Sequence, residues 1–138
     1  MPTAIINYEL GNLRSVQNAL EFLGNKAFIA HTPGELKDAS RIILPGVGAF
    51  GDGMRILNER GWVDKIIEEA TQKKKPFLGI CLGMQLLAEI GTEHGTHTGI
   101  GLIPGIVIRM NVPDKSIRIP HIGWNAVDIK LRNATYSG

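Results

Sequence analysis

The sequence predicts an α/β fold, in which a mostly parallel β-sheet is covered by helices on both faces. Short runs rich in isoleucine and leucine, which suit buried strands, alternate with longer segments whose apolar residues recur at helical spacing. Two of the strand-like runs end abruptly in glycine-rich turns. Because a helix between two strands returns the chain to the same end of the sheet, the alternation implies parallel strands. A chain of 138 residues is expected to hold one domain, residues 1–138.

The first half of the chain supplies three strand-and-helix units. The expected strands span residues 3–8, 26–31 and 41–44, and the expected helices span 13–23, 35–39, 52–58 and 62–74. In the first helix, leucine and valine recur every three or four residues, and Gly24 with Asn25 provides a C-terminal cap. A break near Gly61 separates the last two helical segments.

The second half begins with one more unit and then loses its helices. A buried strand at 76–80 leads into a helix at 82–90 with almost no loop between them. Residues 91–101 are rich in Gly, Thr and His and are expected to form a loop. Strand-like runs follow at 106–110, 117–119 and 125–131. These runs suggest an antiparallel extension or a small side sheet.

Composition excludes several classes of protein. The net charge of +2 is dispersed, so neither nucleic acid nor an anionic membrane is indicated as a partner. The short lysine run at 73–75 closes a helical segment, where cations favour the helix dipole. A single cysteine permits no internal disulfide, and the N-terminus lacks the features of a signal peptide. No apolar run approaches the roughly 18 residues that a membrane helix needs. We therefore expect a cytoplasmic protein.

The strongest local signal is the pattern G-I-C-L-G at residues 79–83. A sharp strand-to-helix turn with flanking glycines exposes the central side chain above the sheet edge, as in the nucleophile elbow of hydrolases. At a helix N-terminus, the Cys81 thiolate is favoured, and the backbone N–H of Leu82 is placed to hold an oxyanion. The alternative is a buried, inert cysteine in a core strand. The glycine context favours Cys81 as a nucleophile.

A second glycine-rich turn, P-G-V-G-A-F-G at residues 45–51, also follows a buried strand. Such a turn can point backbone N–H groups inward as an oxyanion hole or an anion nest, or it can be a plain turn. The spacing does not match that of a phosphate loop. In a doubly wound sheet, this turn and the elbow meet at the carboxyl edge, where ligands bind.

The motifs together resemble the glutaminase subunits of imidazole glycerol phosphate synthase, within the class I glutamine amidotransferases. The matching motifs are I-I-N-Y at 5–8, G-N-L at 11–13, P-G-V-G-A-F at 45–50, G-I-C-L-G-M-Q at 79–85 and P-H-I-G-W-N at 120–125. They occur in the family's order over essentially the whole chain. The resemblance implies the flavodoxin-like class I amidotransferase fold, incomplete at the C-terminus.

The resemblance also implies a site. Cys81 would attack the side-chain amide of glutamine, releasing ammonia and then glutamate, without a cofactor or a metal. The oxyanion would be held by the backbone N–H groups of Val47 and Leu82. The glutamine pocket would include Gly46, Gly48 and Gln85.

A partner is implied as well. Ammonia would pass to a (βα)8-barrel cyclase subunit, in a heterodimer that makes imidazole glycerol phosphate in histidine biosynthesis. The residues that resemble the partner-facing surface are Asn12, Pro120, His121, Trp124 and Asn125. Trp124 is expected to be either an interface anchor or a core tryptophan.

The chain departs from the family chiefly in its catalytic residues, with Asn7, where the family often has Asp, as a smaller departure. A cysteine amidotransferase needs a base and an orienting carboxylate, and the family's Q-F-H-P-E and V-H-S-Y motifs do not occur. None of the chain's histidines is assigned as the base: His31 is expected at the surface, His94 and His97 form a weak metal pair, and His121 is expected to be structural or interfacial. We expect a fragment rather than a naturally short protein, with little or no glutaminase activity and with uncovered apolar surface.

Three other functions remain open. A paralogous amidotransferase that feeds ammonia to a nucleotide-sugar or surface-polysaccharide enzyme would carry nearly the same motifs. A truncated subunit without catalysis would keep the interface and lose the chemistry. Another cysteine hydrolase on the same scaffold would have no need of the P-H-I-G-W-N segment.

Overall fold

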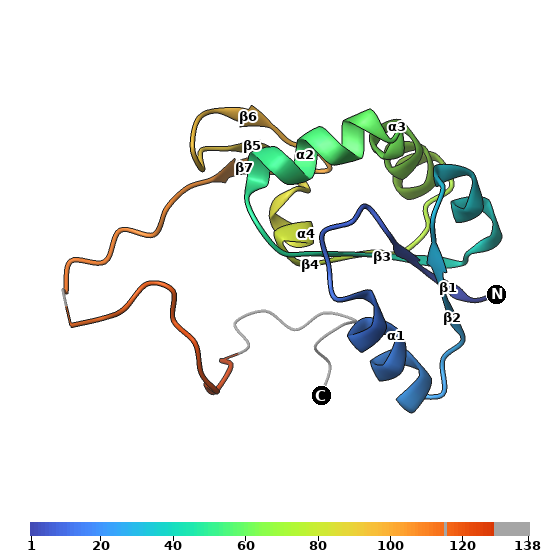
Figure 1. The fold of residues 1–138 in the computed structure, drawn as a ribbon, viewed down its shortest axis with the longest axis horizontal. Coiled ribbons are helices and arrows are strands. Elements are labelled where there is room, and N and C mark those ends of the chain that lie inside the picture. The colour runs from blue at the N-terminus through green and yellow to red at the C-terminus, as the bar shows by residue number, and fades with distance from the viewer. Residues whose placement is uncertain (115, 129–138) are drawn as a thin grey trace.

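A four-stranded parallel sheet lies at the centre of the part that is described by the computed structural model, residues 1–114 and 116–128 (Figure 1). Its strands are β1 (Thr3–Ile6), β2 (Ala27–Ala30), β3 (Arg41–Gly46) and β4 (Phe77–Cys81). They lie in the order β2-β1-β3-β4, and each neighbouring pair is parallel. The predicted α/β fold with a parallel sheet is confirmed.

Helices cover both faces of the sheet, as the sequence predicts. On one face lies α1 (Leu13–Phe22), and on the other lie α2 (Phe50–Glu59), α3 (Trp62–Ile67) and α4 (Leu82–Gln85) (Figure 1). A 3-10 helix, η1 (Pro33–Asp38), follows β2, and one π-helical turn, η2 (Glu68–Gln72), extends α3. Gly61, with φ +70°, separates α2 from α3 at the break that the sequence indicates.

The core lies between the sheet and the face that α2 and α3 cover. Trp62, Phe50 and Leu57 are fully buried there against Ile6 and Leu44 of the sheet. Burying one large apolar side chain stabilises the fold by about 2 kcal/mol. This layer therefore contains most of the buried apolar side chains among the described residues.

The opposite face is covered over β1 and β3 and open over β4. The side chains of Ile5, Ile43 and Leu78 lie in one row across the sheet, because the strand register pairs them in turn. Their exposed fractions rise from 0% and 7% to 53% along that row, and Ile80 is 38% exposed. The uncovered apolar surface expected from the sequence is present on β4.

The predicted helix at 82–90 is wrong in its second half. It ends at Gln85, and the chain enters a second, smaller sheet made by β5 (Ala88–Gly91), β6 (His97–Thr98) and β7 (Ile103–Val107), in the order β6-β5-β7. Strand pairing on both sides of β5 overrides the local helix propensity. A side sheet is present, but residues 88–107 form it instead of the runs predicted at 106–110, 117–119 and 125–131, and β6 lies within the predicted loop at 91–101. Only β5 and β6 are antiparallel, since β5 and β7 are parallel.

The expected strands beyond this sheet differ from the structure. The strand predicted at 106–110 lies at Ile103–Val107, and residues 117–119 and 125–128 form no strand. Residues 129–131 of the last expected strand lie outside the described residues. The described part of 108–128 extends outward from β7 and then turns back, outside the layers of sheet and helix (Figure 1). Without a neighbouring strand to complete their hydrogen bonds, these runs do not form a sheet.

Buried ion pairs join Glu69 of η2 to Lys65 of α3 and to Lys75, which lies just before β4. Glu69 is 1% exposed and lies 2.8 Å from the ammonium of Lys65 and 2.5 Å from that of Lys75. Lys75 also donates to the carbonyl of Leu36. Burial raises the pKa of Glu69, but the hydrogen bonds from both lysines outweigh it and hold the pKa below its ordinary value. Lys75 therefore has a specific partner, beyond the helix-dipole role expected of the lysine run.

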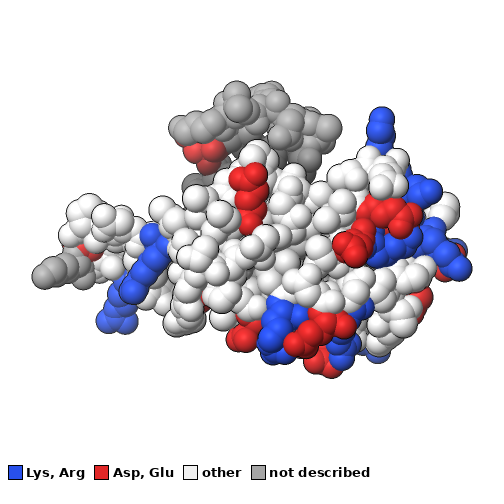
Figure 2. Space-filling model, turned by 90° about the horizontal axis from the view of Figure 1, so that it is seen from above, with Lys and Arg blue, Asp and Glu red and all other residues white. Residues whose placement is uncertain are grey.

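Charged side chains of both signs are intermixed on the surface seen from above, over α2 and α3 (Figure 2). Arg55, for example, lies 3.0 Å from Glu59 and 4.0 Å from Asp52 on α2. The view shows no broad patch of one sign, in keeping with the small net charge. Among the described residues, no helix is both long enough and apolar enough to cross a bilayer.

Candidate active site

Cys81 is the last residue of β4 and the residue that immediately precedes α4. Its backbone has φ +56° and ψ −117°, a conformation that is rare for any residue other than glycine and that costs on the order of 1–3 kcal/mol. The thiol is exposed. The sharp strand-to-helix turn predicted at 79–83 is therefore present, and the alternative of a cysteine buried in a core strand is wrong.

Two glycines allow α4 to sit directly on the sheet. A Cβ atom on Gly79 would lie 2.5 Å from the Cα of Met84 and 2.7 Å from the carbonyl oxygen of Gly83. A Cβ atom on Gly83 would overlap the carbonyl of Leu44 in β3. The pattern G-x-C-x-G thus reflects a close approach of backbones, which presents the cysteine at the sheet edge. Because α4 has only four residues, it supplies a smaller dipole than the predicted nine-residue helix.

Cys81 opens into a cavity of about 790 Å³ at the carboxyl edge of the sheet. Among the predicted site residues, Gly48, Leu82 and Gln85 line this cavity with it. Gly48 has φ +103°, which favours glycine at this turn. Pro120, predicted at a partner interface, forms part of the wall. The two glycine-rich turns therefore meet at one site, as the strand order predicts.

Gly46 and Val47 lie beside the cavity and do not line it. Gly46 is buried in β3, and its Cα pairs with Cys81 across the sheet. A Cβ atom there would lie 2.8 Å from the N atom of Gly83, so Gly46 supports the elbow. The side chain of Val47 is 55% exposed. The role of its N–H group as an oxyanion donor stays a prediction.

Glu93 is a site residue that the sequence analysis missed. Its carboxylate lines the cavity and accepts a hydrogen bond of 2.9 Å from the N–H of Phe50, the first residue of α2. Ala49, which precedes α2, has no side chain that caps the helix. Glu93 therefore joins the 92–96 loop to the glycine-rich turn before α2. An acidic residue in a polar loop with no periodicity carried no signal by which to find it.

The cavity also holds charges of both signs. Arg109 and His94 line it together with Glu93. His94 therefore lines the same cavity as Cys81, which its place in a polar loop did not suggest. Among the described residues, no side chain forms a hydrogen bond with the Cys81 thiol. The observed geometry assigns no base.

Two other histidines have partners of their own. His31 is exposed, as predicted, and its Nδ1 lies 3.2 Å from the side-chain nitrogen of Asn7. His121 lies 2.6 Å from the side-chain amide of Asn125. Neither of these histidines lines the cavity of Cys81.

Beneath the elbow, Tyr8 is fully buried after β1, and its hydroxyl has no hydrogen-bond partner among the described residues. Burial raises the pKa of this hydroxyl above its ordinary value, and the negative charge of the Cys81 thiolate raises it further. Tyr8 was part of a matching motif, but nothing in the sequence indicated its contact with the site.

The predicted interface residues have mixed surroundings. The side chain of Asn12 accepts a hydrogen bond of 3.3 Å from Ser15 N, so it caps α1. Trp124 is fully exposed, at 104%, and the alternative of a core tryptophan is wrong. A partner-facing role for Asn12 and for the 120–125 segment stays a prediction.

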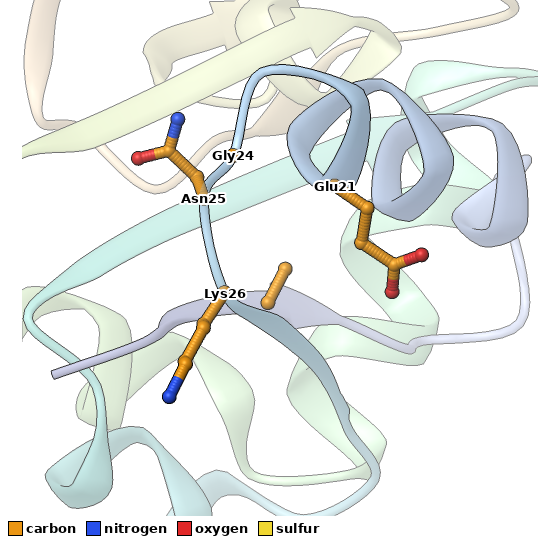
Figure 3. A pocket seen from close by; sticks show the side chains of 5 residues that line it. Glu21, Gly24, Asn25 and Lys26 are labelled. Atoms are coloured by element: carbon orange, nitrogen blue, oxygen red, sulfur yellow. The ribbon is translucent and has the colours of Figure 1, made fainter.

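Other possible sites lack converging chemistry. Among residues 1–114 and 116–128, no three His, Cys, Asp or Glu side chains gather to hold a metal. A second hollow, of about 470 Å³, lies where α1 leads into β2 (Figure 3). The side chains of Glu21, Asn25 and Lys26 diverge around it, so their polar groups do not meet at one point. The cavity at Cys81 is the better candidate.

The sequence is similar to one family of proteins over most of its length. The model of the family described as glutamine amidotransferase class-I matches residues 5–134. Imidazole glycerol phosphate synthase subunit HisH of Desulfitobacterium hafniense (strain DSM 10664 / DCB-2) is 54% identical over 123 residues, which cover 89% of this chain and 56% of that protein. Subunit HisH 1 of Campylobacter jejuni subsp. jejuni (serotype O:23/36, strain 81-176) is 44% identical over 135 residues, or 98% of this chain and 67% of that protein.

Solved structures agree with the fold. A crystal structure of a glutamine amidotransferase superposes with a TM-score of 0.62 at 20% identity, covering 75% of this chain and 54% of that one. The chain therefore spans little more than half the length of several proteins that it matches. The match of the family model over nearly the whole chain, together with the strained cysteine at the sheet edge, shows that the chain belongs to the class I glutamine amidotransferase family.

Proposed function

We propose that this chain carries the nucleophile and part of the glutamine pocket of a glutaminase that supplies ammonia for the synthesis of imidazole glycerol phosphate. The observation that carries the proposal is the strained, exposed Cys81, which opens into one cavity with Gly48, Leu82 and Gln85. An ordinary core cysteine has neither the positive φ nor the shared cavity. The proposed pathway rests on the names of the relatives.

The chemistry follows from the geometry of the elbow. Cys81 Sγ attacks the carboxamide carbon of glutamine, and the carbonyl oxygen becomes an oxyanion. The N–H groups of Leu82 and Val47 are proposed to hold it. Collapse of this intermediate expels ammonia and leaves a thioester, which water hydrolyses to glutamate and the free thiol. A base must accept the thiol proton, and a proton must reach the leaving nitrogen.

The charges in the cavity suit the proposed substrate. Free glutamine is a zwitterion, with an ammonium and a carboxylate at one end. Glu93 and Arg109 line the same cavity and carry the two complementary charges. Gln85 lies one turn after the nucleophile on α4, where its amide can meet the substrate. A neutral peptide or ester would use neither charge.

The ammonia acceptor is proposed to be a (βα)8-barrel cyclase subunit, with which this chain forms a heterodimer in the cytoplasm. Ammonia released into water at neutral pH would be protonated and would lose its nucleophilicity, so a docked partner is chemically required. The relatives are named as subunits of a synthase. The exposed segment at 120–125, with Trp124 at its end, offers an apolar surface for docking.

Covalent labelling tests the proposal. The chain is incubated with the glutamine analogue 6-diazo-5-oxo-L-norleucine, and the adduct is located by mass spectrometry. We expect one adduct, on Cys81. Excess glutamine should slow its formation, and an amino acid that lacks the side-chain amide should not. Cys81→Ser is the control and should take up no label. Labelling that glutamine does not slow would overturn the proposal.

A subunit without catalysis is the second candidate, because no described side chain forms a hydrogen bond with the thiol. Such a subunit would bind the cyclase and take up no label from the analogue. For a subunit of this kind, glutamate release from glutamine should stay low even when the cyclase is present. A paralogous role would show as binding to a sugar-modifying enzyme in place of the cyclase.

A further inference from the structure

Tyr8 presents a polar group in a place where the fold gives it no partner. The residue follows β1, is fully buried, and its hydroxyl makes no hydrogen bond with any described residue. Buried hydroxyls are ordinarily paired, because an unpaired one lowers stability. An unpaired hydroxyl beside a proposed active site therefore calls for a functional explanation.

The hydroxyl lies where three elements of the elbow meet. A Cβ atom on Gly46 would touch the Tyr8 hydroxyl, and it would also lie 2.8 Å from Gly83 N and 2.9 Å from Leu82 Cβ. The Cα of Gly46 pairs directly with Cys81 between β3 and β4. The Tyr8 hydroxyl therefore lies beside the strand position that pairs with the nucleophile, and it is not among the residues that line the cavity.

The protonated form of the Tyr8 hydroxyl is favoured beside a thiolate. Burial raises the pKa of Tyr8, and the charge of the Cys81 thiolate raises it further. A protonated hydroxyl near a thiolate is a hydrogen-bond donor, and a bond to an ionised acceptor is stronger than one between neutral groups. Hydrogen bonds of this kind commonly tighten only when the reacting charge is present.

We propose that Tyr8 stabilises the thiolate form of Cys81 by donating its hydroxyl hydrogen to Sγ from below the elbow. The inference rests on the proposed role of Cys81 as the nucleophile. It adds a second functional group to the site, on the strand-and-turn motif at 5–8. The other titratable or charged side chains that line the cavity with Cys81 are Glu93, His94 and Arg109. A substitution at Tyr8 leaves these three unchanged.

Tyr8→Phe removes the hydroxyl alone, and the reaction of Cys81 with 4,4′-dithiodipyridine between pH 5 and 10 reports the thiolate. We expect the pH–rate curve to move up by about one pH unit, since a charge-assisted hydrogen bond is lost. At neutral pH the thiolate fraction then falls about tenfold, but each thiolate is about threefold more nucleophilic, so the rate falls about threefold. At high pH the variant should react about threefold faster. The two curves therefore cross.

A matched control removes a hydroxyl elsewhere. Ser40 donates to the Met1 carbonyl at 2.9 Å, at the amino end of the sheet. Ser40→Ala should reproduce the wild-type curve. A pH–rate curve for Tyr8→Phe that coincides with the wild-type curve would overturn the inference. If that variant were also more stable than wild type, the hydroxyl would be an unpaired buried group with no role at the thiolate.

A second variant decides the matter if Tyr8→Phe does not fold. The chain has two tyrosines, so fluorotyrosine incorporated into Tyr136→Phe protein replaces Tyr8 alone. A fluorinated phenol is a stronger donor, and the curve should move to lower pH. An unmoved curve would overturn the inference. Failure of wild-type Cys81 to take up the glutamine analogue would instead sink the proposed function, so the two failures are distinguishable.

Discussion

Glu93→Ala removes the carboxylate that caps α2 and lines the cavity of Cys81. The bond from Phe50 N to Glu93 is 2.9 Å long, and α2 has ten residues with no other side-chain cap at its start. Losing a capping acceptor costs about 1 kcal/mol. Losing a negative charge at a helix N-terminus costs about 0.5 kcal/mol more. The variant should therefore be less stable by about 1.5 kcal/mol, or about 5 °C in melting temperature.

Two further variants separate the contributions. Glu93→Gln keeps an acceptor and loses the charge, so it should lose only about 0.5 kcal/mol. Glu59→Gln removes a carboxylate from the C-terminal end of α2, where a negative charge is unfavourable. The same change also removes the exposed ion pair with Arg55. The two effects roughly offset each other, so the free energy of unfolding should change little. Urea unfolding followed by circular dichroism measures all three. Equal losses for Glu93→Ala and Glu59→Gln would refute the capping argument.

Three other variants test the elbow, the buried ion pair and the open face. Gly83→Ala should lose about 3 kcal/mol in urea unfolding, because its Cβ overlaps the Leu44 carbonyl; Gly34→Ala, which meets nothing within 4 Å, is the control. Glu69→Gln should lose about 3 kcal/mol at pH 7. The folded pKa of Glu69 lies below its ordinary 4.5, so its contribution is complete above that pH and disappears as the pH falls through the folded value. Leu78→Lys should reduce self-association in light scattering with little loss of stability, because Leu78 is 53% exposed.

Each of these expectations has an outcome that contradicts it. A fully stable Gly83→Ala variant would show that α4 can move away from β3 without cost. A stability difference between wild type and Glu69→Gln that does not shrink as the pH falls through the folded pKa of Glu69 would mean that the carboxylate is not the origin of the effect. If Leu78→Lys self-associates as much as wild type, the surface that causes the association lies elsewhere.

Much of the fold could be predicted from the sequence. The four strands of the central sheet and the break at Gly61 lie within a few residues of their predicted places. These elements have strong local patterns: continuous apolar runs for strands that are buried in the sheet, and helical spacing for α1 and α2. The elbow was recognisable for the same reason, because its glycines are needed at fixed positions around Cys81.

The predictions that failed concern segments whose structure depends on distant neighbours. Residues 88–90 have a helical composition, but β5 pairs with β6 on one side and with β7 on the other. The run at 117–119 has strand-like residues and no strand beside it. Short apolar runs are compatible with either structure, and the partner decides between them.

The sequence by itself determined the type of each main element, the position of Cys81 at a strand–helix junction and the family to which the motifs point. Only the tertiary structure showed that Glu93 reaches Phe50, that Tyr8 lies beneath the elbow and that one face of β4 is open. Local rules act over a few residues, through backbone conformation and side-chain period. Contacts between residues as far apart as 8, 46, 81 and 93 arise only when the strands pack, because packing is what brings distant parts of the chain within reach.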